Sequence, residues 1–478
     1  MHKDGSNRIE HLKTAVLVVL FVTTILLLYL LWSLDAQGSF HLPDILPHRE
    51  AQNPPDTDLV VVPDSVVYGM GDGSFRRERF YTTEIFKKSI LHLKALHRDP
   101  ALSVTEITKE QFSSALMEYR SSAIYFSYGI PFRELCSRND MPFVVALDAI
   151  RTIDVLAFSE ASPESMFVAD STNEHYYRLH APGETDRYAD MAESEESITL
   201  SVCYTIGNIL GGDNQELMPL FEESSLMPVR WKSDSEETSQ SIRLLLLESL
   251  FGENLDFVRR IADNAGNVTY LYGYGKKTFT YQSDGVLEYK NEAADATAGG
   301  FYKDLETALS FAAVNGLWDG AEASGLRLTL RNAEVISNGK QEGYRFGFGA
   351  HIAEHPLYYE AGLPLIVEVL DGQVSYLRSD MIAVERMPAH GQEKPVQDPA
   401  NVIARNYNHI YNVSTGNVLS VNQDIAFQYV VSSVRDVRVG LVRLLNNEWL
   451  QPAWILETRG GQRFYFSLYE AIPIGTGK

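Results

Sequence analysis

Cysteine is scarce in this sequence, with only Cys136 and Cys203 among 478 residues. Two cysteines can form one disulfide or stay free, and the sequence leaves both states open, but a disulfide-rich secreted scaffold is excluded. Positive charge is also scarce: 41 Lys and Arg stand against 63 Asp and Glu, which gives a formal net charge of -22. Nucleic acid and anionic lipid surfaces are therefore poor partners for this chain.

The sequence has no catalytic or metal-binding motif in a context that would allow it to function. His351, Glu354 and His355 match the H-x-x-E-H pattern of inverted zinc peptidases, in which two His one helical turn apart bind Zn²⁺ and the Glu acts as the base. Pro356 follows directly and residues 346–349 alternate like a strand, so no helix is expected there, and in a strand the two His would lie about 13 Å apart. We interpret them as strand or loop residues, and predict no catalytic residue, no metal and no cofactor.

Long hydrophobic runs are absent except for one. Residues 14–34 are uncharged and mostly apolar, and as a helix they would span about 31 Å, close to the thickness of a bilayer core. Lys3, Arg8 and Lys13 precede this run, whereas Asp35 follows it. The positive-inside rule then predicts a single-pass cell-membrane protein with a cytoplasmic N-terminus and an extracytoplasmic bulk.

A cleaved signal peptide is the alternative reading of this run. The run is longer than the about 7 to 15 apolar residues of a signal peptide, and residues 34–36 make a poor cleavage site, so an anchor is favoured. Within it, Thr23 and Thr24 are the only hydrogen-bonding side chains near the middle of the membrane. They either bond to their own backbone carbonyls or form a transmembrane contact with another helix.

The remaining sequence predicts folded domains of the α+β class, because 45% of the residues are hydrophobic and the Gly and Pro contents are ordinary. A Pro-rich polar stretch after the hydrophobic run indicates a linker. The predicted organisation is a cytoplasmic stub (1–13), a transmembrane helix (14–34), a linker (35–57), an N-terminal α+β domain (58–235), a central α+β domain (236–390) and a C-terminal α+β domain (391–478).

Hydrophobic periodicity predicts helices and strands in the first half. Helices are expected over 81–97 and 109–119, and another from 241 to a stop signal at Gly252. Strand-like runs cover 58–68, 123–128, 143–147 and 153–159. Acidic, Ser-rich stretches at 193–197 and 233–239 indicate solvated loops, and the second is a candidate domain boundary.

The second half shows a repeated order of one helix followed by strands. Asp284-Gly285 and Asp371-Gly372 are typical of two-residue hairpin turns. Each unit is expected to pack its helix on one face of an antiparallel sheet. The predicted helices are 301–315 and 401–411, and the predicted strands are 278–281, 286–289, 326–330, 344–351, 363–370, 374–382, 425–431, 437–445, 450–457 and 463–468.

Several fragments carry a resemblance to a known family. They are residues 124–132 (IYFSYGIPF), 250–258 (LFGENLDFV), 277–289 and 311–318 (FAAVNGLW), in this order. The ending 449–466 (WLQPAWILETRGGQRFYF) is similar to the closing hairpin of PepSY-type domains, which YycH shares with its sister family YycI. The chain thus resembles the YycH family, the membrane-anchored regulators of the essential cell-wall two-component system of low-GC Gram-positive bacteria.

The resemblance implies a three-domain extracytoplasmic protein on one membrane anchor, without enzymatic activity. Its implied partners are a sensor histidine kinase, contacted through the membrane, and a YycI-like protein. A membrane-anchored extracytoplasmic cell-wall enzyme is the alternative. An enzyme should show a cleft with a carboxylate pair of perturbed pKa, whereas a regulator should show an apolar surface patch for its partner.

Overall fold

The structure of the chain is a computed structural model that describes most residues beyond residue 53. The described residues are 23–24, 54–79, 83–142, 144–182, 186–192, 201–220, 229–232, 246–292, 299–323, 325–352, 355–380, 383–385, 394–416, 422–444, 447 and 449–477.

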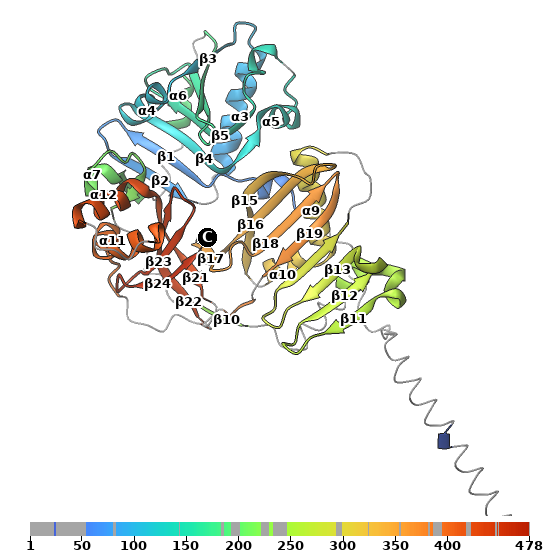
Figure 1. Ribbon diagram of the computed structural model, residues 1–478. Coiled ribbons are helices and arrows are strands. Elements are labelled where there is room, and N and C mark those ends of the chain that lie inside the picture. The colour runs from blue at the N-terminus through green and yellow to red at the C-terminus, as the bar shows by residue number, and fades with distance from the viewer. Residues whose placement is uncertain are drawn as a thin grey trace, which may run out of the picture.

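The N-terminal unit, residues 54–220, is built on one antiparallel sheet. In the described part of the chain this sheet has nine strands in the order β3-β7-β6-β5-β4-β1-β2-β8-β9 (Figure 1). The strands are β1 (Ser65–Met70), β2 (Phe75–Arg79), β3 (Ser103–Ile107), β4 (Arg120–Pro131), β5 (Thr152–Ser159), β6 (Ser165–Asp170), β7 (His175–His180), β8 (Ser201–Thr205) and β9 (Leu217–Pro219). The helices are α2 (Thr57–Val60), α3 (Thr83–Arg98), α4 (Lys109–Met117), α5 (Phe132–Arg138), α6 (Arg187–Ala192) and α7 (Ile206–Leu210), with a 3-10 turn η1 (Val145–Leu147).

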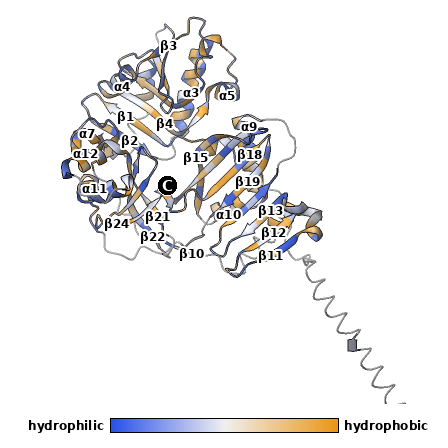
Figure 2. Ribbon diagram, in the orientation of Figure 1, coloured by the Kyte–Doolittle hydropathy of each residue, from blue (hydrophilic) through white to orange (hydrophobic). Residues whose placement is uncertain are grey.

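Both faces of this sheet are covered, because the inner strands β5 and β6 are buried at almost every position. In β5, Val155 and Ala157 share a core with α4, whereas Leu156 and Phe158 share a core with α3. Apolar side chains recur at helical spacing on α3 and point to that second core; they are Ile85, Ile90, Leu93 and Leu96. The hydropathy colouring shows apolar inner strands such as β4 between helices of mixed character (Figure 2).

The central unit, residues 246–385, places the helices α9 and α10 against a long antiparallel sheet. Asp371 and Gly372 both have positive φ, 47° and 74°, as a two-residue turn between β18 and β19 requires. The helices are α9 (Phe301–Val314) and α10 (Leu317–Ala323), with 3-10 turns η3 (Gly252–Phe257) and η4 (Gly273–Gly275). The strands are β11 (Arg259–Ala262), β12 (Val268–Tyr272), β13 (Lys277–Tyr281), β14 (Leu287–Asn291), β15 (Leu326–Ser337), β16 (Glu342–Ile352), β17 (His355–Tyr359), β18 (Leu365–Leu370), β19 (Gln373–Ser379) and β20 (Ala383–Glu385).

The C-terminal unit, residues 394–477, repeats the order of helices before strands. Its first helix has clear sequence limits: the Asp398 side chain accepts a hydrogen bond from Ala400 N at 2.8 Å, Pro399 occupies the first turn, and Gly416 ends the helix in a left-handed conformation. The elements are α11 (Pro399–Thr415), α12 (Gln423–Ser433), β21 (Val434–Arg443), β22 (Trp449–Thr458), β23 (Arg463–Ser467) and β24 (Pro473–Gly477).

One sheet runs through the central and C-terminal units. Strand β17 pairs in parallel with β21, with Leu357 opposite Leu441, and this pairing joins the two antiparallel meanders. The strand β10 (Val229–Lys232), which follows the N-terminal unit, pairs with both β22 and β20. The described residues thus form a sheet of fifteen strands, which comprises β10 to β24.

Most of the predicted regular elements are confirmed, and the α+β character is confirmed with them. The helices predicted over 81–97, 109–119, 301–315 and 401–411 are α3, α4, α9 and α11. The hairpin predicted around Asp284-Gly285 is formed by β13 and β14. Residues 246–251, the described end of the helix predicted from residue 241, are helical. The predicted domain boundaries near 235 and 390, and the acidic stretches 193–197 and 233–239, lie outside the described residues.

Three predicted strands were wrong in whole or in part. Residues 425–431 are not a strand, because they lie within the helix α12. Residues 145–147 of the predicted strand 143–147 form a 3-10 turn, and the start of the predicted strand 58–68 belongs to the helix α2. Short runs rich in β-branched and aromatic residues cannot be assigned by periodicity alone, since a helix with apolar residues on two sides gives the same signal.

Candidate functional site

The three units meet at a buried network of charged side chains. Asp64, just before β1, accepts hydrogen bonds from Arg331 in β15 and from Nη1 of Arg438 in β21, the latter at 3.2 Å. Each of these three side chains is less than one-fifth exposed. Arg331 lies where the register of β15 and β16 shifts, and such a bulge turns a side chain out of the regular pleat. A single carboxylate of the N-terminal unit therefore holds one cation from each of the other units.

The network continues from Arg438 into the N-terminal unit. Arg438 Nε donates to Asp436, and Arg77 Nη1 of β2 donates to the other oxygen of Asp436 at 3.0 Å. Arg77 Nη2 also donates to the carbonyl oxygen of Leu217 at 3.1 Å. We call Asp64, Arg77, Arg331, Asp436 and Arg438 the junction network. Its three guanidinium groups and two carboxylates leave one unbalanced positive charge within the set.

Burial and neighbouring charges act on the ionisation of these groups in different directions. Burial, with the adjacent Arg438 charge, lowers the pKa of Arg331 to about 10, which leaves its guanidinium charged at neutral pH. For Arg438, burial lowers the pKa, but the Asp436 charge outweighs that and the net shift is upward. Both cations therefore stay charged near neutral pH, and the network is a set of fixed charges with a holding role.

A second polar contact joins the short helix α5 to the start of α9. Glu134 Oε2 accepts a hydrogen bond from Tyr302 N at 3.3 Å, in the first turn of α9, where backbone N–H groups lack helical partners. Arg138 Nη1 donates to Glu306 at 3.0 Å, and its guanidinium lies 4.8 Å from the centre of the Tyr302 ring. Two charged residues of α5 thus bind α9 across the boundary between the N-terminal and central units.

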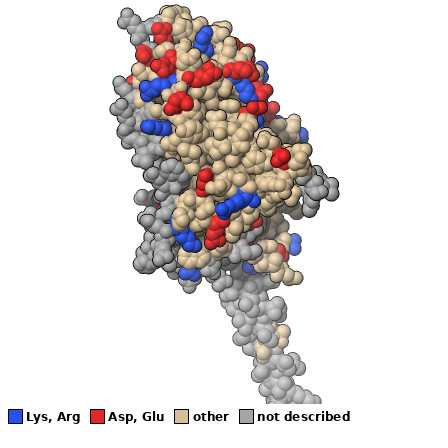
Figure 3. All heavy atoms as spheres, turned by 90° about the vertical axis from the view of Figure 1, so that its left-hand side faces the viewer, with Lys and Arg blue, Asp and Glu red and all other residues tan. Residues whose placement is uncertain are grey.

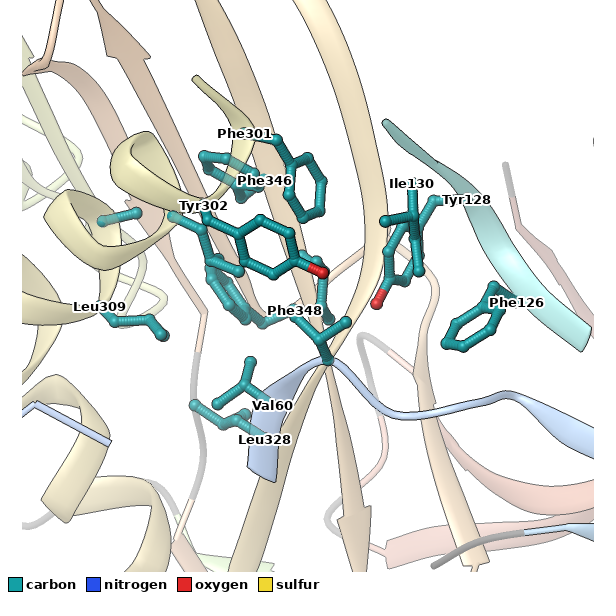
Figure 4. Close-up of a cluster of buried hydrophobic side chains, with 14 of the residues drawn as sticks. Val60, Phe126, Tyr128, Ile130, Phe301, Tyr302, Leu309, Leu328, Phe346 and Phe348 are labelled. Atoms are coloured by element: carbon teal, nitrogen blue, oxygen red, sulfur yellow. The ribbon is translucent and has the colours of Figure 1, made fainter. Parts of the chain in front are cut away.

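An aromatic cluster accompanies this contact. Tyr128 of β4 stacks on Phe301 of α9 with ring centroids 6.4 Å apart, and Phe301 packs edge-on against Phe346 of β16 at 5.7 Å. Figure 4 shows the β4 side chains Phe126 and Tyr128 facing those of α9. The two units therefore share one continuous apolar core.

The end of the N-terminal unit inserts into the C-terminal unit. Asn214 is buried, and its Nδ2 donates to the carbonyl oxygens of Val431 and Val434 at 2.7 and 2.8 Å. Ile206 and Met218 belong to the apolar core formed by α11, α12 and β21 to β23. Every pair of units is therefore connected by packing as well as by polar contacts.

An open groove of about 730 Å³ lies beside this insertion, between α12 and residues 212–214. Ile425 and Tyr429 of α12 line it and are 60% and 39% exposed. The face of the molecule that carries α7 and α12 shows a broad uncharged area below an acidic region (Figure 3). Ile425 and Tyr429 are thus two exposed apolar side chains, about one helical turn apart, in a groove whose other lining residues are polar, charged or glycine.

The structure places His351 and His355 in strands, as predicted, but in the two paired strands β16 and β17 and not in a single strand, so the separation expected along one strand does not apply. His351 lies near the end of β16 and His355 begins β17, with His351 opposite Pro356 in an antiparallel pair. His351 Nε2 accepts a hydrogen bond from Arg331 Nη2 at 2.7 Å. Burial, together with the Arg331 charge, lowers the pKa of His351 well below its usual value, so the ring is neutral. Glu354 lies outside the described residues. Over the described ranges, no group of three or more His, Cys, Asp and Glu side chains is arranged to hold a metal ion.

We therefore expect the purified full-length protein to contain no stoichiometric zinc. Arg331 occupies the ring nitrogen of His351 that faces the junction network, so a metal there would have to displace a buried cation. Glu354→Gln should change the free energy of unfolding by no more than about 0.5 kcal/mol, since the sequence predicts an exposed position for Glu354, where the loss of one charge has a small effect. Elemental analysis and denaturation measure both quantities. One equivalent of zinc that disappears when His351 and His355 are both changed to Ala would contradict this prediction.

Two neighbouring buried carboxylates in the N-terminal unit accept hydrogen bonds from a turn and do not line a cleft. Asp154 accepts a hydrogen bond from Ser171 N at 2.8 Å, and Asp170 accepts from Asn173 N at 3.1 Å, so both hold the β6–β7 turn. Burial raises the pKa of Asp154, but neither residue lines the groove beside α12. This pair therefore has the geometry of a structural turn.

The two threonines and the two cysteines singled out in the sequence lie away from the junction network. Thr23 and Thr24 are helical and exposed, whereas the rest of residues 14–34 lies outside the described residues. Within the part of the chain that is described, no helix combines the length and apolar character needed to cross a bilayer. Cys136 and Cys203 are both free and buried, and they lie in different apolar cores.

No residue of the junction network was predicted from the sequence. Asp436 and Arg438 did carry a local signal, because they share one face of a strand whose other face, Val437 and Val439, is buried in the C-terminal core. No sequence pattern links Asp436 and Arg438 to their partners. Asp64 lies 374 positions before Arg438, and Arg331 lies about one hundred positions before it.

Comparison with solved structures gives the class of fold to which this arrangement belongs. No protein-family model and no curated protein matches the sequence. The structure is similar to the crystal structure of YycH from Bacillus subtilis, with a TM-score of 0.50 and 9% identity, over 86% of this chain and 98% of that one. An uncharacterised protein from Eubacterium rectale aligns with a TM-score of 0.29 and 12% identity over 52% of this chain and 80% of its own, which carries no argument. The first match shows a YycH-like fold.

Proposed function

We propose that this chain is a membrane-anchored, non-enzymatic regulator of a sensor histidine kinase that controls cell-wall metabolism. The observation that carries the proposal is the YycH-like fold, which spans nearly the whole of both chains. The sequence fragments that resemble the YycH family support it independently. Its proposed partners are the kinase, a YycI-like protein and the membrane, and its net charge of -22 disfavours nucleic acid.

The geometry of the described residues favours a binding protein over the alternative, a cell-wall enzyme. Their junction network holds three units together through fixed charges, with one positive charge in excess, whereas a hydrolase needs a carboxylate free to exchange protons. The exposed side chains Ile425 and Tyr429 on α12 offer a small apolar contact for a protein partner. Cleavage of purified peptidoglycan by the full-length protein would support the enzyme instead.

The proposed topology is a cytoplasmic N-terminus and an extracytoplasmic bulk. It follows from Lys3, Arg8 and Lys13 on one side of the hydrophobic run and Asp35 on the other. Protease added to intact protoplasts is therefore expected to digest the chain beyond Asp35, as followed by an antibody to the C-terminal end. Full protection of that end until the protoplasts are lysed would refute the topology.

The proposed contact with the kinase involves Thr23 and Thr24. Hydroxyl groups that bond across membrane helices contribute about 0.6 to 2 kcal/mol each. Changing both to Leu is expected to preserve insertion, to reduce co-purification of the kinase with the full-length protein, and to weaken its effect on kinase phosphorylation. Affinity capture from solubilised membranes followed by mass spectrometry measures the association.

A matched control separates specific contact from hydrophobic anchoring. Val18 and Val19 lie in the same run and carry no hydroxyl, so changing both to Leu should leave capture and regulation intact. Absence of any sensor kinase from the wild-type capture would contradict the proposed function. Full regulation by the Thr23→Leu, Thr24→Leu protein would instead remove only the hydroxyl contact.

A further inference from the structure

The first turn of α9 contains a buried carboxylate that has no hydrogen-bond partner. Asp304 is only 1% exposed, and among the described residues no donor reaches either of its two oxygens. Gly299 lies just before the helix, and a Cβ atom at that position would overlap Oδ1 of Asp304. Buried polar groups normally have partners, because burial of an unpaired group, and above all of a charge, is unfavourable. Asp304 therefore destabilises this turn whenever it is ionised.

The titratable groups around Asp304 add to this effect. Glu134 of α5 and Asp371 in the β18–β19 turn both disfavour its ionised form by their negative charge. Lys303 favours the ionised form, but it is exposed, so solvent and salt weaken its effect. Tyr344 of β16 is neutral at neutral pH, because burial raises its pKa to about 12. The surroundings of Asp304 thus favour the protonated carboxyl group.

The other charged groups near this end of α9 are paired with one another or lie on another face. Arg138 of α5 donates to Asp58 of α2 at 3.3 Å and to Glu306 of α9 at 3.0 Å. Glu368 of β18 and Arg378 of β19 alternate with core residues of their strands, so they project from the opposite face of the sheet. Over the described ranges, Lys303 is the cation that acts on Asp304.

Asp304 lies where the N-terminal and central units meet. Phe301, three residues before it on α9, stacks on Tyr128 of β4, and Glu134 accepts a hydrogen bond from Tyr302 N. The positive end of a helix favours a nearby anion, but Glu134 already occupies this N–H group. Loss of the charge on Asp304 therefore stabilises the contact between α5 and the first turn of α9.

The effect of pH on this contact has a definite sign. Burial raises the pKa of Asp304 to about 6, whereas the pKa of an Asp in an unfolded chain is about 3.9. The folded protein therefore binds the proton more tightly than the unfolded chain does. The stability of this region is lowest above about pH 7, rises as the pH falls through about 6, and is fully gained below about pH 4.

We propose that the contact between α5 and α9 is a pH-sensitive device, in which uptake of one proton by Asp304 removes a buried charge beside Glu134 and makes this contact open less often. The proton comes from solvent when the first turn of α9 opens locally. Mild acid thus holds the N-terminal and central units together more firmly. This inference is independent of the proposed regulatory function.

Hydrogen–deuterium exchange of the full-length protein in lipid nanodiscs tests this proposal. Peptides from residues 301–314 are followed by mass spectrometry, and the rates are corrected for the intrinsic effect of pH on amide exchange. The two pKa values of Asp304 predict that protection of the first turn is about tenfold higher at about pH 5.0 than at about pH 7.5. Equal protection at the two pH values in the wild type would overturn the proposal without any variant.

Three variants assign the effect to its residues. Asp304→Asn removes the charge at every pH, so its protection should be high and equal at both pH values. Glu134→Gln keeps an oxygen for the N–H of Tyr302 but removes the neighbouring charge, so the midpoint of the change should move to lower pH. Glu322→Gln is the matched control, because Glu322 is an exposed carboxylate on the next helix, and it should keep the tenfold change.

Two outcomes with these variants would contradict the proposal. A tenfold change that persists in Asp304→Asn would assign the proton to another group and overturn the device. A midpoint that does not move in Glu134→Gln would overturn the role of the neighbouring charge. Urea denaturation of Asp304→Asn at both pH values serves as a second readout, in which the wild type should lose stability relative to the variant as the pH rises.

Discussion

Arg438→Met is expected to lower the free energy of unfolding by about 1.5 to 3 kcal/mol, because it removes hydrogen bonds to two buried carboxylates, Asp64 and Asp436, each of which keeps one other Arg partner. Methionine keeps most of the side-chain volume, so the loss reports the charge and its hydrogen bonds. Arg438 links residues of the N-terminal and C-terminal units, and its removal should also loosen the contact between them. Urea denaturation of the full-length protein, followed by tryptophan fluorescence, measures the change.

The matched control for this variant is Arg345→Met. Arg345 also lies on a long strand and donates to a carboxylate, Glu368, at 2.8 Å, but it is 46% exposed. A solvated pair of this kind contributes about 0 to 1 kcal/mol, so the control should unfold nearly like the wild type. Equal effects of the two substitutions would show that the junction network is no more than surface pairing.

Phe301→Ala is expected to cost about 3 to 5 kcal/mol of unfolding free energy, because it opens a cavity where two units share one core. Phe301 is fully buried, and its ring contacts both Tyr128 of the N-terminal unit and Phe346 of the central unit. The same denaturation experiment measures the loss. Phe257 is 76% exposed, and Phe257→Ala should stay within about 0.5 kcal/mol of the wild type. A loss below about 1 kcal/mol for Phe301→Ala would mean that the two units do not depend on this contact.

The sequence predicted elements where local periodicity and tertiary packing agree. Helix α9 is an example, because Phe301, Leu305 and Leu309 form one stripe in the sequence and one buried stripe in the structure. Helix α12 was wrongly predicted as a strand, since its buried residues Val430 and Val431 are accompanied by exposed Ile425 and Tyr429. The residues that favour a strand by composition are held in a helix by packing against α11 and the C-terminal sheet.

The site could not be predicted because it is defined by distant parts of the chain. The sequence could predict that the H-x-x-E-H pattern is not helical, since Pro356 and the preceding alternation indicate strands, and β16 and β17 are strands. It could not predict that Arg331 is the partner of His351. Arg331 reaches the ring from the neighbouring strand β15 at a bulge, and no local pattern marked that bulge. The anchor and its two threonines stay predictions from the hydrophobic run.

The insertion of residues 206–218 into the C-terminal core has a consequence for how the chain is made. Asn214 bonds to the carbonyl of Val431, which lies 217 positions later, and Ile206 and Met218 pack in the core that contains Trp454 and Phe464. During synthesis from the N-terminus, these residues have no surface to bury against until the last hairpin has emerged. A truncated chain that ends before β22 would leave the edge of the first unit exposed to proteases and chaperones. The N-terminal unit therefore acquires its final packing contacts only after β22 and β23 have been synthesised.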